Sequence, residues 1–354
     1  MKLAQLQLTQ DVVLFLSRLL LAGVHLLVLI VAAWLLLHFY PGDHWAPVRL
    51  ASYFAPWLFM ALIPALAVAW LNRDRRLSGL IAVFIVIYTG FYWPVLVPRQ
   101  RAALAGAGGQ TLRVMTFNVN MNNRNVPELA RLIRDESPDL IAFQEIVGDL
   151  AGVLLPELEA YPYQLVDTSG SLPLALVSRY PLIALPKPAG VDRVQYALVE
   201  TPAGLVSVWN LHPIPVITAG WEAQRATLRQ VAEAIAHEER PLIVLGDFNT
   251  TEQTDNYHLI AAQLTDVHWA VGQGFGFTFP DLKRAVSPDQ PWLLQWLLQT
   301  GPVVKIDHIF VSDHFTPLAL HVAPTSAGSD HRPVMATLLF NGRDNGQVTM
   351  NGNN

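Results

Sequence analysis

The chain has 354 residues, of which 52% are hydrophobic and only 14% are charged, against about 25% charged in an average soluble domain. It contains no cysteine, which excludes disulfide bonds and thiolate metal sites but does not identify a compartment. From residue 111 onward there are 15 basic and 25 acidic side chains, and this excess of negative charge argues against a nucleic-acid binder, because phosphate contacts need the opposite balance.

Three long apolar runs occupy the N-terminal part of the chain. None contains Asp, Glu, Lys or Arg, and each is long enough to cross a bilayer, which takes about 20 apolar residues as a helix. The runs are Leu19–Tyr40, Leu50–Leu71 and Leu77–Pro98. Buried core helices are the alternative, which three runs in tandem disfavour. The first run is also longer than a signal-peptide core of about 7–15 residues. Pro56 and Pro64 do not argue against the second run, because membrane helices tolerate proline. We predict a membrane anchor with three transmembrane helices over residues 1–98.

The connections that flank these runs carry unequal numbers of basic residues. One side has Lys2, Arg18, Arg73, Arg75 and Arg76, and the other side has Arg49, Arg99 and Arg101. Cytoplasmic connections usually hold the excess of basic residues. We therefore predict a multi-pass protein of the cell membrane, with a cytoplasmic N-terminus and an extracytoplasmic domain after Pro98.

The rest of the chain divides into a linker, one domain and a tail. Residues 99–110 include the stretch AALAGAGGQ, whose composition is typical of a flexible linker. A phosphate-binding glycine loop would need a preceding strand, and none is predicted there. Residues 111–341 suffice for one α/β domain. The polar tail, residues 342–354, is expected to be disordered.

The first two strands predicted in this domain end in polar side chains. Leu112–Asn120 alternates as a strand and presents Asn118 near its end. A helix over Val126–Glu136 follows, with leucines and an isoleucine on one face. The next strand, Asp139–Ile146, is apolar through Phe143 and ends in Gln144 and Glu145. A charged residue at the end of a buried strand needs a partner, so a salt bridge and a ligand role are both open for Glu145.

The same pattern returns further along the chain. A strand ends at His212, and a helix over Gly220–His237 follows. The stretch PLIVLGDFNT, Pro241–Thr250, then reads as a short buried strand followed by Asp247 and Asn249. On a locally extended backbone these two side chains would point the same way. An Asx turn is the alternative, because both residue types favour turns.

Two further acidic groups lie near the end of the domain. VVKIDHIFVS, Val303–Ser312, predicts a strand with Asp307 in its middle, where a carboxylate needs a hydrogen-bonded histidine or a metal. GSDHRPVMATLLF places Asp330 and His331 in a turn before the last strand. Pro333 suits the first residues of that strand.

Eight polar residues therefore lie at or near predicted strand ends: Asn118, Glu145, His212, Asp247, Asn249, Asp307, Asp330 and His331. Each has a structural explanation when taken alone, but eight hard oxygen or imidazole groups are difficult to assign to structure together. Carboxylates and carboxamides without thiolates suit a hard ion such as Mg²⁺ or Mn²⁺. Histidines near such an ion suit proton transfer and charge stabilisation.

The motifs FNVN, LIAFQEI, LVSRYPL, LHPIP, LGDFN, IDHIF and SDHRPV occur in this order across Leu112–Phe340. Together they resemble the endonuclease/exonuclease/phosphatase superfamily, which includes nucleases related to deoxyribonuclease I, sphingomyelinases and inositol-phosphate phosphatases. The resemblance implies an α/β fold, a four-layer α/β sandwich of two packed mixed β-sheets flanked by helices. The whole chain also resembles a membrane-anchored subgroup with three N-terminal transmembrane helices and an extracytoplasmic domain.

The resemblance also implies how a metal would be held. Glu145 would be the main ligand of Mg²⁺ or Mn²⁺, with Asn118 beside it and Asp330 close to the ion. Asp247 would hold a second ion or orient the attacking water.

The same resemblance assigns catalytic roles to the remaining residues. Asn249 would hold a phosphate oxygen beside Asp247, and His212 would hydrogen-bond the phosphate in the transition state. His331, fixed by Asp307, would act on the attacking water or on the phosphate. Because no serine, cysteine or aspartate nucleophile motif is visible, direct attack by water is preferred to a covalent intermediate.

Three functions fit this sequence. The first is a membrane-tethered phosphodiesterase or phosphatase that acts outside the cell membrane on a lipid-linked phosphate or pyrophosphate or on a phospholipid head group. The second is a metal-dependent nuclease, and the third is a catalytically silent binding module on a membrane anchor. The anchor favours the first, the negative charge argues against nucleic acid, and the complete set of polar residues argues against the third.

One apolar segment of the domain is not specified by the resemblance. Pro291–Gln299, PWLLQWLLQ, would gather Trp292, Leu293, Trp296 and Leu297 on one face if it is helical. Tryptophan and leucine are favourable at a membrane–water boundary, which predicts a segment that contacts the lipid bilayer beside the site. Ordinary packing against the sandwich or the membrane helices is the alternative.

Overall fold

The computed structural model describes residues 2–97, 109–168, 173–187, 193–216, 220–283 and 289–341. The chain divides into two compact units, Met1–Leu96 and Val97–Asn354, and each is described by itself. Most of the predicted linker, 99–110, and all of the predicted tail, 342–354, lie outside the described residues.

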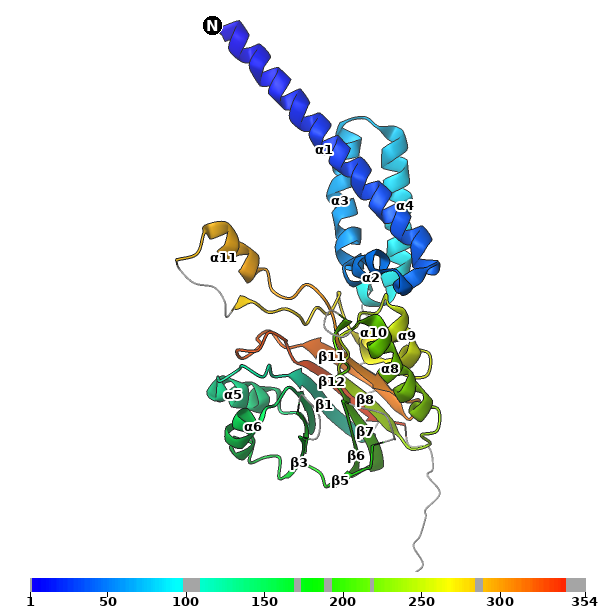
Figure 1. Cartoon of the computed structure of the whole chain (residues 1–354), viewed down its shortest axis with the longest axis vertical. Coiled ribbons are helices and arrows are strands. Elements are labelled where there is room, and N and C mark those ends of the chain that lie inside the picture. Colours follow the sequence, from blue (N-terminus) through cyan, green and yellow to red (C-terminus); the bar gives the residue numbers. More distant parts are fainter. Residues whose placement is uncertain are drawn as a thin grey trace, which may run out of the picture. The chain divides into compact units, whose positions relative to one another are not determined.

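The N-terminal unit is entirely helical, drawn in blue and cyan in Figure 1. Its elements are α1 (Lys2–Phe39), a short 3₁₀ turn η1 (Gly42–His44), α2 (Ala46–Tyr53), α3 (Ala55–Leu71) and α4 (Arg75–Leu96). The helices meet through aromatic contacts, and the rings of Phe59 and Tyr88 are stacked with their centroids 5.6 Å apart. The Trp34 indole N–H donates to Ser52 Oγ at 3.2 Å. Many leucine and valine side chains on the outside of these helices stay exposed.

Two of these helices, α1 over Asp11–Phe39 and α4, are long and apolar enough to cross a membrane. The predicted second span, Leu50–Leu71, is not one helix: α2 and α3 are bent by 71° and qualify as a third span only as a pair. The break lies at Phe54, and Pro56 follows in the first turn of α3. Proline has no N–H to continue the hydrogen bonds of a preceding helix, but it fits the first turn of a new one. Pro64, by contrast, lies inside α3.

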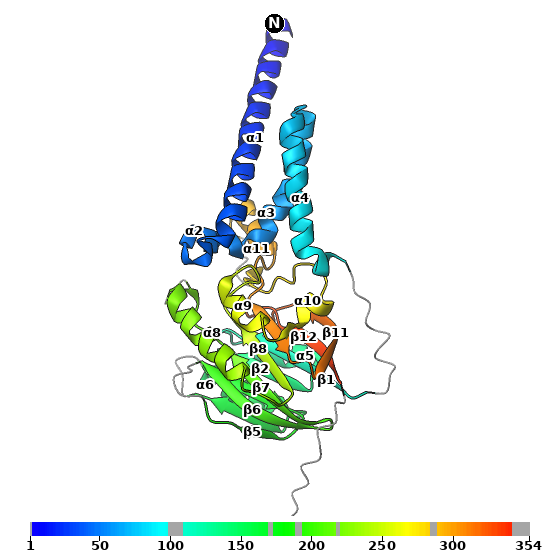
Figure 2. The same cartoon turned by 90° about the vertical axis from the view of Figure 1, so that its right-hand side faces the viewer.

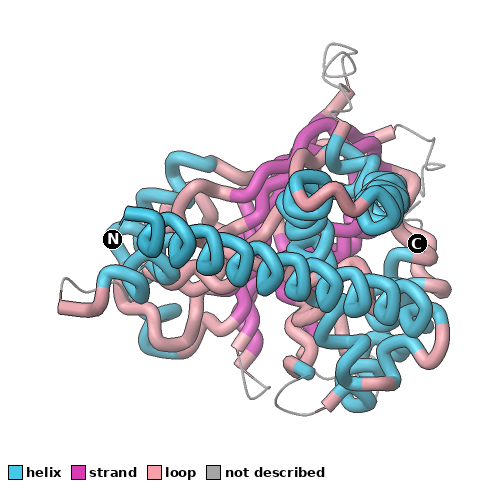
Figure 3. The backbone as a smooth tube through the Cα atoms, turned by 90° about the horizontal axis from the view of Figure 1, so that it is seen from above, coloured by secondary structure: helices cyan, strands magenta, loops and turns pink. Residues whose placement is uncertain are grey.

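Two six-stranded sheets form the centre of the second unit. The first has the order β11 (Phe315–Val322), β12 (Val334–Phe340), β1 (Thr111–Asn118), β2 (Leu140–Gln144), β4 (Leu174–Ser178) and β3 (Tyr163–Asp167). The second has the order β5 (Leu182–Ala184), β6 (Val194–Thr201), β7 (Gly204–Leu211), β8 (Leu242–Asp247), β10 (Asp307–Val311) and β9 (Thr265–Asp266). Both are mixed, because β1–β2 and β7–β8 are parallel pairs within otherwise antiparallel sheets. Figure 3 shows the strands, in magenta, gathered into one block.

Helices cover the outer face of each sheet, as Figures 1 and 2 show. On the first sheet lie α5 (Val126–Glu136), α6 (Gly148–Leu154) and the 3₁₀ turn η3 (Leu155–Glu157), and on the second lie α8 (Trp221–Ile235) and α9 (Asp255–Ala261). Strand residues alternate between these outer cores and an inner core between the sheets: Val244 packs outward, while Ile243 and Leu245 pack inward. This arrangement confirms the predicted four-layer α/β sandwich. Two further helices among the described residues are α10 (Val267–Val271) and α11 (Trp292–Gln299).

The predicted strand Val303–Ser312 is longer than the observed one. β10 begins only at Asp307, so this residue is the first of its strand and not in the middle. Val304 pairs instead with Phe279 in an isolated bridge outside the sheet. The apolar sequence pattern could not show that Val304 pairs with Phe279 and not within β10, because its side chain would be buried in either pairing.

A buried amide joins the two sheets close to the ends of the parallel strands. Asn210, in β7, donates through Nδ2 to the carbonyl oxygens of Phe143 at 2.9 Å and Ala175 at 3.2 Å in the other sheet. Its Oδ1 accepts from Gln144 Nε2 at 2.7 Å. These bonds hold the last residues of β2 against β7, and so set the distance between the polar groups that follow both strands.

We expect Asn210→Ala to lower the free energy of unfolding by about 1–3 kcal/mol, because it leaves buried groups without hydrogen-bond partners. Chemical denaturation of the full chain in detergent measures the change. Asn122→Ala, at an exposed position, is the control and should unfold like the unmodified chain. Equal stability of the two variants would show that the bridge between the sheets contributes little.

Candidate active site

The end of the first parallel pair brings an amide and a carboxylate together. Asn118 is the last residue of β1 and lies beside Gln144, the last residue of β2. Glu145 follows with a left-handed backbone, φ 58°, which turns its side chain back toward β1. Its Oε1 accepts from Asn118 Nδ2 at 3.1 Å, and its Oε2 accepts from the Met121 N–H at 3.1 Å. The carboxylate is thus held by two donors at the sheet edge.

The second parallel pair ends at the same edge because of a glycine. Gly246 has φ 153°, and a Cβ at this position would lie 1.9 Å from the carbonyl oxygen of Leu211 in the neighbouring strand. Only glycine permits this approach. Asp247 then ends β8 and pairs with Asp307, the first residue of β10, while His212 directly follows β7.

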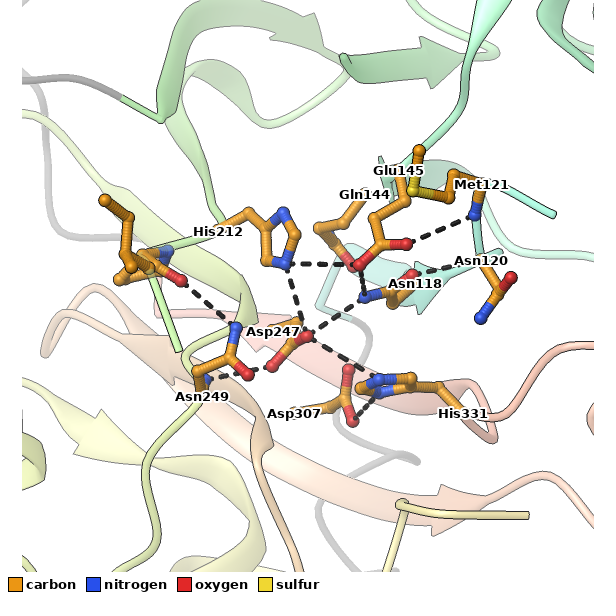
Figure 4. Close-up of polar contacts among 12 residues, drawn as sticks. Asn118, Asn120, Met121, Gln144, Glu145, His212, Asp247, Asn249, Asp307 and His331 are labelled. Atoms are coloured by element: carbon orange, nitrogen blue, oxygen red, sulfur yellow. Dashed lines mark hydrogen bonds and ion pairs between the residues drawn. The ribbon is translucent and has the colours of Figure 1, made fainter. Parts of the chain in front are cut away.

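Asp247 is the group that the other polar side chains surround (Figure 4). Its Oδ2 accepts from Asn118 Nδ2 at 3.0 Å and lies 3.5 Å from His212 Nε2 and 3.7 Å from His331 Nε2. Glu145 Oε1 lies 3.6 Å from the same nitrogen of His212. Burial raises the pKa of Asp247, but His331, His212 and Asn118 outweigh this effect and lower it to about 2. Asp247 is therefore an ionised carboxylate although it is buried.

His331 is held by a second carboxylate. Its Nδ1 lies 2.9 Å from Asp307 Oδ2, and the ring of Phe279 packs against the imidazole with a centroid distance of 4.7 Å. Burial lowers the pKa of His331, but Asp307 and Asp247 outweigh it and raise the value to about 10. Burial in turn raises the pKa of Asp307 above its ordinary value. At neutral pH this imidazole is therefore a cation, and its Nε2 is the nitrogen directed to Asp247.

Asp247 and Asn249 form an Asx turn and also belong to the site. The Asn249 N–H donates to Asp247 Oδ1 at 2.9 Å, and its Nδ2 donates to the Pro213 carbonyl oxygen at 3.1 Å. The extended backbone expected between them is wrong, because Asn249 has a left-handed φ of 50°. Asp247 and Asn249 can therefore form a turn and also serve in a site, because the turn orients both side chains.

Asp330, predicted beside the metal, lies next to a residue that the sequence reasoning did not single out. Its Oδ1 accepts from Asn120 Nδ2 at 2.7 Å, and the Asn120 N–H donates to Asn118 Oδ1 at 3.0 Å. Asn120 therefore orients the Asn118 amide. The motif FNVN contained this second asparagine, two residues after the first, and that spacing was the available signal.

A second buried polar cluster, also not predicted, borders the site. Asp266 Oδ2 accepts from the Tyr257 hydroxyl at 2.8 Å and pairs with Lys305 Nζ at 3.3 Å. His308 Nδ1 lies 2.7 Å from the same ammonium, and its Nε2 lies 2.9 Å from the Thr250 carbonyl oxygen. These contacts fit an imidazole protonated on Nε2 that accepts from Lys305 and donates to the turn after β8. The lysine and histidine in VVKIDHIFVS were the sequence signal.

The donor groups fit a hard divalent cation. Among the described residues, the ion pairs of Glu145, Asp247 and Asp307 involve histidines and neither lysine nor arginine. A different grouping, Asp247 with Asp307 and His331, has ligand atoms within 4.8 Å of one another, but a protonated His331 has no nitrogen lone pair with which to bind an ion. Three carboxylates that have only imidazoles as cationic partners leave room for an ion with two positive charges, and their oxygens are ligands that Mg²⁺ and Mn²⁺ prefer. Glu145, with Asp247 across the Asn118 amide, would hold it.

A known protein family matches this part of the chain. The sequence profile of the Endonuclease/Exonuclease/phosphatase family matches residues 115–331, a range that contains all eight predicted site residues. No curated protein sequence matches the chain.

Solved structures share the fold of the second unit. An endonuclease/exonuclease/phosphatase from Bacteroides vulgatus is 21% identical with a TM-score of 0.51, covering 65% of this chain and 99% of its own. A family protein from Bacteroides thetaiotaomicron is 18% identical with a TM-score of 0.51, covering 66% and 96%. A functionally unknown conserved protein from Enterococcus faecalis is 16% identical with a TM-score of 0.51, covering 65% and 100%. At these identities the likeness concerns the fold.

We expect Mn²⁺ or Mg²⁺ to raise the melting temperature of the full chain in detergent, because an ion that binds only the folded state stabilises it by mass action. Glu145→Gln should reduce this shift, since it removes one anionic ligand and keeps the shape. Glu157→Gln, at an exposed position, is the matched control and should keep it. An equal shift in both variants would contradict a metal held by Glu145.

Proposed function

Because this chain belongs to the endonuclease/exonuclease/phosphatase family, whose members hydrolyse phosphoester bonds, we propose that it is a membrane-tethered phosphoesterase. It would depend on a divalent metal, Mg²⁺ or Mn²⁺, and would hydrolyse a phosphate ester or pyrophosphate by direct attack of water. The observation that carries the proposal is the ionised, buried Asp247 held between Asn118, His212 and the His331 cation.

Each residue around Asp247 then has a chemical task. The Asp247 carboxylate orients the attacking water and accepts its hydrogen bond, for which a lowered pKa keeps it ionised. His331 presents Nε2 as a cation that stabilises negative charge on the phosphate, while Asp307 fixes the ring through Nδ1. His212 and Asn249, which follow parallel neighbours β7 and β8, approach the phosphate oxygens from the other side of Asp247.

The metal would be held by Glu145 and Asp247, with Asn118 between their carboxylates. When bound, such an ion neutralises charge on the phosphate oxygens and lowers the pKa of a bound water. Met121 and Asn120 support this role, because their backbone N–H groups fix Glu145 and Asn118.

The substrate we propose is a lipid-linked phosphate or pyrophosphate or a phospholipid head group. Two features of the chain support it: the apolar helices α1 and α4 can tether the domain to a bilayer, and the second unit is acidic. A nuclease would need many basic side chains along the nucleic-acid backbone, and the excess of acidic residues after 110 argues against this. Proximity to a surface rich in lipid phosphate raises the effective concentration of such a substrate.

The basic residues in the connections support a proposal for the side of the membrane on which the domain lies. Arg73 lies between α3 and α4, and Arg75 and Arg76 are the first residues of α4. These three residues support an anchor of three crossings with the bent pair α2 and α3 as one span. We propose that residues 111–341 form an extracytoplasmic catalytic domain.

In the purified full chain, we expect Glu145→Gln to abolish metal-dependent hydrolysis of soluble phosphate monoesters and diesters. Asp247→Asn and His331→Ala should each reduce the catalytic rate at least about a hundredfold, the lower end for a lost proton-transfer or charge-stabilising group. Glu157→Gln should keep the original rate, and circular dichroism should show that every variant is folded. Unchanged turnover in the three site variants would refute the assignment of this site.

Reporter fusions test the orientation. We expect alkaline phosphatase fused after residue 341 to be active and green fluorescent protein at the same position to be dark, because the first folds only outside the cytoplasm and the second only inside. Replacing Arg73, Arg75 and Arg76 by glutamine should weaken this bias. The reverse pattern in the unmodified chain would overturn the proposed topology and with it the preference for an outer-leaflet substrate.

A further inference from the structure

Helix α11 leaves large apolar side chains uncovered. Trp292 is 77% exposed, Leu293 50% and Leu294 41%. These values contradict packing of the three residues into the sandwich, which was one of the two packing alternatives to lipid contact. The helix contains no charged residue, and the next turn repeats the same composition with Trp296, Leu297 and Leu298, whose side chains lie outside the described part of the structure. Figure 1 shows α11, in orange, at the end of an arm that extends beyond the sheets of its own unit.

The base of this arm is fixed directly beside the site. Phe279 and Val304 close it by reciprocal backbone hydrogen bonds, with Phe279 N–H to Val304 O at 3.0 Å and Val304 N–H to Phe279 O at 2.8 Å. Phe279 packs on the His331 ring. Arg332 and Asp281 strengthen the same base, with Arg332 Nε donating to Asp281 Oδ2 at 2.6 Å. The arm that carries α11 therefore begins and ends beside His331.

The length of the segment between α4 and β1 restricts which surface α11 can contact. Leu96 ends α4, the last helix that is long and apolar enough to cross a membrane, and Thr111 begins the first strand of the domain. At about 3.3–3.6 Å per residue the segment between them can extend to no more than about 50 Å. A domain tethered at this length stays close to the bilayer. An uncharged helix of tryptophan and leucine is favourable at the headgroup level, where the indole sits between water and hydrocarbon.

We propose that α11 inserts its apolar face into the interfacial region of a lipid bilayer and thereby places the active site over lipid headgroups. The inference rests on the proposed function for its premise that the chain is membrane-tethered and acts on lipid phosphate. It adds that the domain has its own lipid contact, separate from the membrane-spanning helices, and that this contact governs access to membrane-embedded substrate.

Fluorescence quenching tests the contact without using activity. Because the chain has no cysteine, Trp292→Cys and Ile183→Cys each create a single thiol for an environment-sensitive nitrobenzoxadiazole label. Ile183 is a matched control, since it is 44% exposed and lies on β5, away from α11 in Figures 1 and 2. The full chain is reconstituted singly in nanodiscs of phosphatidylcholine and phosphatidylglycerol. We expect lipids with a spin label high on the acyl chain to quench the probe at 292 and not at 183.

The other occupants give different results. Quenching at 292 by aqueous iodide, as strong as at 183, would show that α11 faces water and would overturn the proposal. Protection from both iodide and spin-labelled lipid would show that α11 packs against another part of the same chain, and would overturn the proposal equally. Quenching by lipid supports the contact even if no hydrolytic activity is found, so this test can succeed while the proposed function fails.

Activity measurements test the consequence. Trp292→Ser combined with Leu293→Ser should lower the rate on a phospholipid or lipid-linked phosphate in the nanodisc several-fold, while the rate on a soluble phosphate ester and the melting temperature stay unchanged. Ile183→Ser should change neither rate. An equal loss of rate on both substrates would show that α11 maintains the structure of the site. An unchanged rate on the lipid would contradict a role of the helix in substrate access.

Discussion

The arrangement of the candidate site depends on keeping the Asp247 carboxylate ionised although it is buried. Removing a charge from water costs several kcal/mol unless partners compensate, and the loss of one partner of a buried charge pair typically costs about 3–5 kcal/mol. The partners come from separate parts of the chain: Asn118 at the end of β1, His212 after β7 and His331 before β12. Two sheets must therefore end at the same edge, and the Asn210 amide fixes them there. Fold and site are consequences of the same constraint.

Features set by residues close in the chain could be predicted from the sequence, whereas features set by contacts with distant residues could not. The helix Val126–Glu136 was predicted with its observed bounds, because its apolar spacing and its proline in the first turn are local signals. The left-handed backbone of Glu145, and the pairing of Val304 with Phe279 that shortens β10, depend on neighbours distant in the chain. The eight polar residues were found because strand ends are recognisable, but the motif resemblance and not the pattern supplied their roles, which stay predictions.

The N-terminal helices and the arm that carries α11 both show what an apolar sequence pattern cannot predict. A run without charges indicates that a helix can cross a membrane, but not where the helix breaks. Pro56 lies in the first turn of α3 and not within one long span. In PWLLQWLLQ the composition left packing and lipid contact open, and the exposure of Trp292 argues only against packing into the sandwich. The acidic domain, the apolar helices and the exposed α11 all support a substrate that a membrane presents, in contrast to one held by a long basic surface.

The central claim is that the site around Asp247 hydrolyses membrane-presented phosphate with the help of a divalent ion. The most direct measurement is phosphate release or head-group release by the purified full chain in lipid nanodiscs, with Mg²⁺ or Mn²⁺ and with chelator, across lipid pyrophosphates, phospholipids, nucleotides and DNA. The account predicts metal-dependent release from at least one lipid class and much slower reaction of nucleotides and DNA. Efficient cleavage of DNA without turnover of any lipid, or equal rates with and without chelator, would contradict it.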